Sequence, residues 1–167
     1  MSISNNDILT KLHDILSANN SVGGDYDISK NLNGRVKAIY KGVEGMHEEF
    51  PIMKTLLPCV FLEVANKQEV FGQLGNSAKR NMELSYTIVP YTSHGIGTGA
   101  EGEARENASK EIIQLTDNIE RLMRQNVNLS GTVQRCHVTS TDYRSTVRES
   151  VYTCQSVIRL QILKYSD

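Results

Sequence analysis

A segment in the middle of the chain alternates between apolar and polar residues, and it reads Asn81-Met82-Glu83-Leu84-Ser85-Tyr86-Thr87-Ile88-Val89-Pro90-Tyr91. In a β-strand, successive side chains point to opposite faces of the sheet. One face of this strand would therefore carry Met82, Leu84, Tyr86 and Ile88. The pattern predicts a long strand with one buried face, and Pro90 is expected to close it.

The helix that follows is the second strong signal. Its apolar residues recur at helical spacing, which predicts a buried stripe of Ala108, Ile112, Leu115, Ile119, Leu122 and Met123. Three acids stand four residues before a base, in the pairs Glu106–Lys110, Asp117–Arg121 and Glu120–Arg124. Each such pair adds about 0.2–0.5 kcal/mol to a helix. We expect this helix to start near Glu103 and to end at about Gln125.

The loop between this strand and helix contains Gly97, Gly99 and Gly102, which match the G-x-G-x-x-G pattern of dinucleotide sites. A dinucleotide-binding strand is buried on both faces, whereas this one alternates. Glu101 and Glu103 would also repel a pyrophosphate at the start of the helix. The glycines therefore indicate an adaptable connection, and we expect no cofactor.

The other elements follow from periodicity and turn signals. Helical spacing from Ile8 to Leu16 predicts an N-terminal helix, capped by Asn5 or Asn6. Strands are predicted at 35–40, 59–65, 132–143 and 147–165, the last two joined by a turn at Arg144-Ser145-Thr146. The order helix, three strands, helix, two strands predicts an α+β fold, with a mainly antiparallel sheet of about five strands and two helices packed on one face. The chain is expected to form a single domain, 1–167, with flexible loops at about 41–57, 66–78 and 92–103.

The chemical signals argue against an enzyme. The four histidines, His13, His47, His94 and His137, are scattered, and no G-x-S-x-G elbow is present. Cys59, Cys136 and Cys154 fall in apolar, strand-like contexts and are expected to be buried thiols. We therefore expect no catalytic residue and no metal. The apolar run from Leu56 to Leu62 is far too short to span a membrane.

Nucleic-acid binding is an alternative of another class, as is a small nucleotide-binding enzyme. Arg135, Arg144, Arg148 and Arg159 lie on or near the last two strands, with Tyr143 and Tyr152 interleaved. A single-strand-binding sheet combines basic and aromatic side chains on one face. The net charge of −1 gives no general attraction to DNA or RNA. A solvated or subunit-facing strand surface is therefore the favoured interpretation.

The whole pattern resembles the tail-terminator (tail-completion, head–tail joining) proteins of long-tailed bacteriophages. The resemblance is carried by the N-terminal helix, the alternating strand 81–91, the glycine-rich loop, the helix ending Leu122-Met123-Arg124 and the long terminal hairpin. It implies a non-enzymatic virion protein, assembled in the host cytoplasm into a homohexameric ring at the head–tail interface. Such a ring caps the tail tube, stops its polymerisation and docks to the head or neck.

The implied partners are other copies of the chain, the tail-tube protein and a head–tail connector or neck protein. No membrane and no specific nucleic acid is implied, although DNA passes through such a ring. A neck or connector protein of the same virion region is the nearest alternative. From expected exposure, we place Tyr143, Arg144 and Arg148 at an interface between copies, and Val70, Phe71 and Leu74 in a loop that contacts a partner.

Overall fold

The computed structural model describes residues 4–21, 24–49, 57–70, 80–95, 101–148 and 151–166. Its elements in chain order are α1 (Asn5–Ala18), β1 (Ala38–Val43), α2 (Met46–Glu49), β2 (Cys59–Val70), β3 (Arg80–Gly95), α3 (Glu101–Gln125), β4 (Arg135–Arg148) and β5 (Val151–Ser166). The five strands form one sheet in the order β1-β2-β3-β5-β4. β1 runs parallel to β2, and the other three pairings are antiparallel. The predicted α+β class with a mainly antiparallel five-stranded sheet is confirmed.

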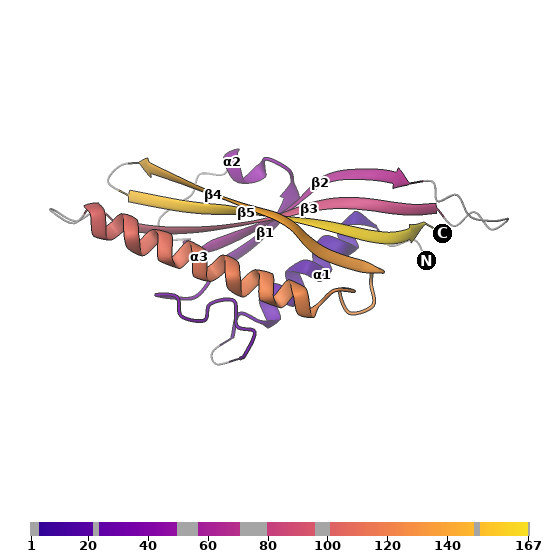
Figure 1. Cartoon of the computed structure of the whole chain (residues 1–167), viewed down its shortest axis with the longest axis horizontal. Coiled ribbons are helices and arrows are strands. Elements are labelled where there is room, and N and C mark those ends of the chain that lie inside the picture. Colours follow the sequence, from indigo (N-terminus) through magenta and orange to yellow (C-terminus); the bar gives the residue numbers. More distant parts are fainter. Residues whose placement is uncertain are drawn as a thin grey trace.

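The long helices α1 and α3 lie on one side of the sheet, and α2 lies on the other (Figure 1). We call these two sides the helix face and the open face. On β3 the predicted alternation is confirmed, because Leu84, Tyr86 and Ile88 are fully buried on the helix face. β5 sends its own alternate residues, among them Ile158 and Leu160, into the same core. The main core is therefore the layer between the sheet and the two long helices.

Helix α3 confirms the predicted stripe, and all six of its predicted core residues are buried. Two of the three predicted ion pairs form, each with a 2.7 Å separation: Glu106–Lys110 and Glu120–Arg124. Arg121 instead donates to the side-chain oxygen of Asn118, at 3.0 Å. The amide of Asn118 in turn donates to the carbonyls of Ile28 and Lys30, which fastens the segment before β1 against the helix.

Helix α1 begins one residue earlier than its predicted caps would allow. The cap is Ser4, whose hydroxyl accepts from the backbone N–H of Asp7 at 3.2 Å. Asp7 accepts from the backbone N–H of Ser4 at 2.7 Å, which completes a capping box. These hydrogen bonds from Ser4 lower the pKa of the Asp7 carboxyl. The expectation that Asn5 or Asn6 caps the helix was wrong, because both lie inside it.

The predicted turn at Arg144-Ser145-Thr146 was also wrong. These residues lie within β4 and pair with Gln155, Cys154 and Thr153 of β5. Some of the expected loop residues likewise belong to regular elements, namely 41–43, 66–70, 92–95 and 101–103. A single helical turn, α2 at Met46–Glu49, also lies within the loop expected at 41–57.

Candidate interaction surface

Strand β4 forms one edge of the sheet and projects two apolar side chains that remain half exposed. Tyr143 is 49% exposed and Val147 is 48% exposed. Their partners in β5 are Ser156 and Tyr152, which point to the helix face, so both side chains lie on that face as well. Arg144 is exposed and points to the open face, because side chains alternate along a strand. Arg148 is the last residue of β4, and its side chain lies outside the described residues.

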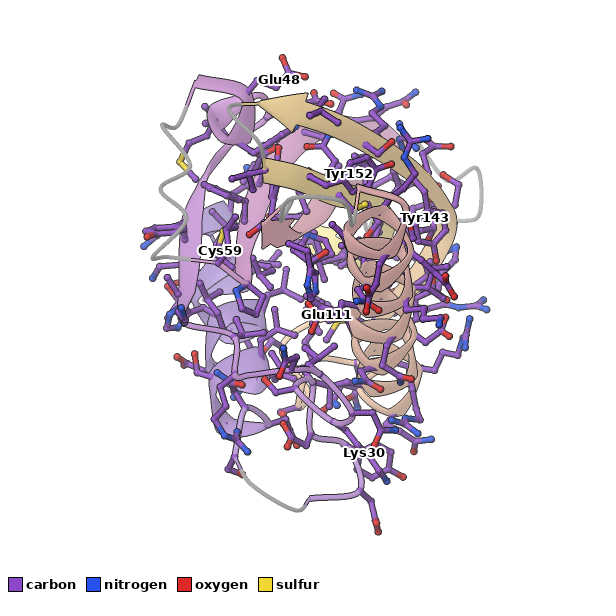
Figure 2. All side chains as sticks on the ribbon, turned by 90° about the vertical axis from the view of Figure 1, so that its left-hand side faces the viewer. Lys30, Glu48, Cys59, Glu111, Tyr143 and Tyr152 are labelled. Carbon is purple, nitrogen blue, oxygen red and sulfur yellow. The ribbon has the colours of Figure 1, made fainter. Side chains whose placement is uncertain are left out.

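Tyr143 lies beside α3 (Figure 2). Partial burial raises the pKa of its phenol, and the negative charges of Asp117 and Glu120 raise it further. A hydrogen bond with Thr116 acts in the opposite direction. The Tyr143 ring is therefore partly buried and lies beside acidic residues of the neighbouring helix.

Helix α3 and the turn after it add further apolar surface on the same side of the molecule. Ile113 and Val127 are each about half exposed. Seven residues are close to two turns of a helix, so Ile113 shares the side of α3 from which Glu120 reaches β4. Val127 follows the end of α3 and lies near Glu120, because both line the same groove. With Tyr143 and Val147 they make up four of the six large apolar side chains that are exposed among the described residues. We call this set of four residues the α3/β4 side.

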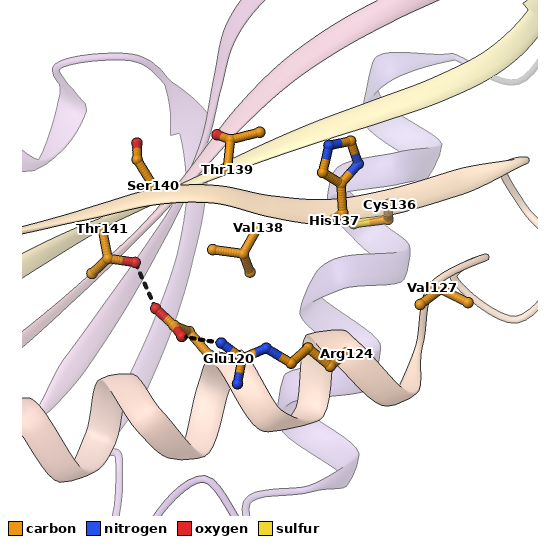
Figure 3. A pocket seen from close by; sticks show the side chains of 9 residues that line it. All are labelled: Glu120, Arg124, Val127, Cys136, His137, Val138, Thr139, Ser140 and Thr141. Atoms are coloured by element: carbon orange, nitrogen blue, oxygen red, sulfur yellow. Dashed lines mark hydrogen bonds and ion pairs between the residues drawn. The ribbon is translucent and has the colours of Figure 1, made fainter.

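A groove of about 510 Å³ lies between the C-terminal half of α3 and the first half of β4 (Figure 3). Its lining includes Glu120, Arg124, Val127 and residues 136–141. The carboxylate of Glu120 accepts from the Thr141 hydroxyl at 2.6 Å and pairs with Arg124 at 2.7 Å. The hydrogen bond between Glu120 and Thr141 holds α3 against the edge strand. The groove itself extends the α3/β4 side.

The open face contains a fully buried carboxylate beneath α2. Glu63 is 0% exposed and accepts from the backbone N–H of His47 at 2.8 Å and that of Gly45 at 3.2 Å. Its oxygens also lie 2.8 Å from the imidazole Nδ1 of His47 and 3.4 Å from the hydroxyl of Thr87, which donates to it. Through these hydrogen bonds Glu63 fixes α2 on the sheet. An apolar cluster that includes Phe61 and Tyr91 lies beneath α2. This arrangement accounts for the burial of the carboxylate without a catalytic role.

The arginines and tyrosines of the last two strands lie on opposite faces. The β4–β5 register pairs Arg135 with Leu163 and Arg144 with Gln155, so both arginines share the open face with Arg159. Tyr143 and Tyr152 point to the helix face, where the guanidinium of Arg105 lies 5.3 Å from the centroid of the Tyr152 ring. The mixed basic and aromatic face expected of a single-strand-binding sheet is not formed by these residues.

His94 lies in β3 rather than in the loop where we placed it. Its Nε2 is 3.0 Å from a carboxylate oxygen of Glu111, at angles that do not make a hydrogen bond. The other oxygen of Glu111 accepts from the backbone N–H of Asn33 at 2.9 Å. Glu111 therefore ties α3 to the end of β3 and to the segment before β1, which is a structural role.

All three cysteines are free and buried, as expected. Burial raises the pKa of Cys59 from 9.0 to about 12, and burial likewise raises that of Cys136 to about 12. Below pH 9 the thiols are neutral in both the folded and the unfolded chain, so their contribution to stability is complete there. Above that pH the unfolded chain releases protons that the folded chain retains.

We therefore expect the free energy of unfolding to fall as the pH rises from 9 toward 12. The loss should approach about 1.4 kcal/mol per pH unit for each buried thiol. Urea unfolding at about pH 7, 9 and 10 measures the slope. The Cys59→Ala/Cys136→Ala variant is the control, and it should show a flatter profile. An unchanged slope in this variant would contradict the assignment to the thiols.

Several expectations fall on residues that the structure does not describe. Phe71, Leu74, Gly97 and Gly99 lie outside the described residues, and so does the side chain of Val70, whose backbone ends β2. Gly102 lies in the first turn of α3. Within the described part of the chain, no group of three or more potential metal ligands comes together. Among the same residues, no helix is long and apolar enough to cross a membrane.

Comparison with known protein-family models gives no match, and comparison with curated protein sequences gives none either. The similar solved structures include a chain from the virion of a native gene transfer agent (GTA) particle, with a TM-score of 0.38 and 8% sequence identity. The matched region covers 93% of this chain and 94% of that chain.

Proposed function

We propose that this protein is a non-enzymatic structural subunit of a phage-like virion, and that it assembles with copies of itself into a ring. The observation that carries the proposal is the α3/β4 side. An edge strand of 14 residues and an adjoining helix present half-exposed apolar side chains there. Exposed apolar residues gathered in one place are typical of surfaces that other proteins cover. Tyr143, Arg144 and Arg148 would then lie at the contact between copies.

Within that class, we propose the role of a tail terminator. The support is the order and length of the elements, which match those that the resemblance requires, including the long alternating strand, the long helix and the terminal hairpin. In this role the ring would close the end of the tail tube and bind the head or neck. Val70, Phe71 and Leu74 remain our proposed contacts with the tube or the neck.

Native mass spectrometry over a concentration series tests the ring. A hexamer has a mass of 6 × 18.6 = 111.6 kDa. We expect the variant Val147→Lys to lose this species, because a charge would be buried in the contact between copies. Tyr26→Lys is the matched control, since Tyr26 is also exposed but belongs to the segment that connects α1 to β1. A protein that stays monomeric at every concentration would overturn the ring.

A second measurement separates the terminator from a neck protein. Polymerised tail tubes of the same virus, mixed with the protein and viewed by negative-stain electron microscopy, should carry a ring at one end. A neck protein would leave the tubes bare and would bind the head–tail connector instead. Bare tubes in the presence of assembled rings would therefore reject the terminator role and retain the structural one.

A further inference from the structure

The two edges of the sheet are complementary to each other. Within the described sheet, β1 and β4 each have a paired strand on one side only. We infer that the outer edge of β4 in one copy pairs with the outer edge of β1 in the next copy, so that the copies join head to tail. The inference rests on the proposed self-assembly and names the surface that the α3/β4 side meets.

The strand directions permit this pairing. β1 is parallel to β2, and the three antiparallel steps from β2 through β3 and β5 leave β4 antiparallel to β1. A rotation about an axis along the strands preserves strand direction from one copy to the next. The β1 edge of the next copy would then approach β4 in the antiparallel sense. Since β1 and β4 are different surfaces, the contact is heterologous. Such contacts form a ring when the rotation from copy to copy adds up to a full turn.

The exposed apolar side chains of the two edges lie on matching faces. Val43 ends β1, is 70% exposed, and shares the helix face with Ile39 and Lys41. Tyr143 and Val147 project from β4 on the helix face too. Followed across the sheet, the register places Val43 level with Val138 and Ile39 level with Tyr143. In a continuous sheet Val43 would therefore lie beside Val138 of the neighbouring copy, and Ile39 beside its Tyr143. Cross-strand pairs of an aromatic and a β-branched residue are favourable.

On the helix face, the charges of the two edges are opposite. Lys41 is exposed on β1, and its ammonium lies 3.3 Å from the hydroxyl of Thr10 on α1. Beside Tyr143 on the other edge, the exposed Asp117 and the part-buried Glu120 create an acidic environment. A two-fold contact between two β4 edges would place like charges together and would leave Val43 uncovered. Charge complementarity therefore favours the β4–β1 contact over a symmetric dimer.

Disulfide trapping tests the pairing. Val43→Cys is combined in one chain with Val138→Cys, Thr141→Cys or Tyr143→Cys, which sample the expected register and two further positions on the helix face of β4. Opposed residues in antiparallel strands lie about 4.5–5.5 Å apart at Cα, within the range that a disulfide spans. The three native thiols are buried, so they do not compete under mild oxidation. We expect at least one double variant to give a ladder of covalent multiples of 18.6 kDa that collapses on reduction.

The single variants are the controls. In a head-to-tail contact, Val43→Cys or Tyr143→Cys alone leaves every introduced thiol without a partner thiol and gives monomer on a denaturing gel. Efficient covalent dimers from a single variant would reveal a two-fold contact and overturn the inference. Rings seen by native mass spectrometry, with no ladder from any double variant, would overturn it as well while leaving the proposed function standing.

A charge exchange provides a second test. Lys41→Asp or Asp117→Lys alone should weaken assembly about two- to fivefold, as expected for a partly exposed ion pair. The double variant restores the pair and should recover the wild-type assembly. Two single effects that simply add in the double variant would show that Lys41 and Asp117 do not meet.

Discussion

The Glu63→Ala variant should lose about 3–5 kcal/mol of its free energy of unfolding, the magnitude observed when one partner of a buried polar pair is removed. The reason is the number of donors that Glu63 satisfies. Its carboxylate is fully buried and accepts from two backbone N–H groups, at Gly45 and His47, and from the Thr87 hydroxyl. The His47 imidazole also binds it, at 2.8 Å. Without the carboxylate, these groups stay buried with no acceptor.

Two control variants isolate this effect. Urea unfolding gives the free energy of unfolding of Glu63→Ala and of both controls. Glu48→Ala removes a neighbouring acid whose side chain is 66% exposed, and it should change the free energy of unfolding by less than about 0.5 kcal/mol. Glu63→Gln keeps the size of the side chain and one acceptor oxygen, so its loss should be smaller than that of Glu63→Ala. Equal losses from Glu63→Ala and Glu48→Ala would refute the account of Glu63 as the group that pins α2.

The centre of the fold could be predicted from the sequence because local periodicity specifies it. The strand around Tyr86 and the helix around Leu115 each bury one face. A buried face requires apolar residues at regular intervals, and these intervals are visible in the sequence. The pairing of β1 with β2 produces no such periodic pattern of apolar residues. It is a parallel contact made across a long connection, so it depends on tertiary packing rather than on a local turn.

The edge strand shows where periodicity fails. Residues 144–146 are polar because β4 is exposed along much of its length, and a polar run of this kind is easily mistaken for a turn. The structure places all three inside the strand. Of the residues predicted at the contact between copies, Tyr143 and Arg144 do lie exposed on this edge, but on opposite faces.

The buried pair on the open face was missed for a related reason. Glu63 stands as a lone acid within an apolar strand, and His47 precedes it by sixteen residues in a segment expected to be a loop. A single acid in a strand of apolar residues is the one local signal that could have identified the pair, since an ionisable group is rarely buried without a partner. Val43 was missed because an isolated valine at a strand end carries no pattern at all.

The Leu115→Ala variant should lose about 2–5 kcal/mol of its free energy of unfolding, the range for a leucine truncated in a well-packed core. Leu115 is fully buried and belongs to the core cluster in which α3 packs on the sheet. Truncation removes buried apolar area and leaves a cavity that a rigid helix on a sheet cannot readily close. Urea unfolding should be measured at low protein concentration, because assembly would add to the apparent stability.

Ile113→Ala is the matched control, two residues away on the same helix. Ile113 is about half exposed, so its truncation should change the free energy of unfolding of the monomer by less than about 0.5 kcal/mol. If the α3/β4 side is covered by a second copy, the same truncation should reduce the amount of ring in native mass spectrometry. The two variants thus separate two roles of α3. Leu115 packs the helix on the sheet and stabilises the monomer, whereas Ile113 contributes to the contact between copies. A large loss of monomer stability in Ile113→Ala would contradict that division.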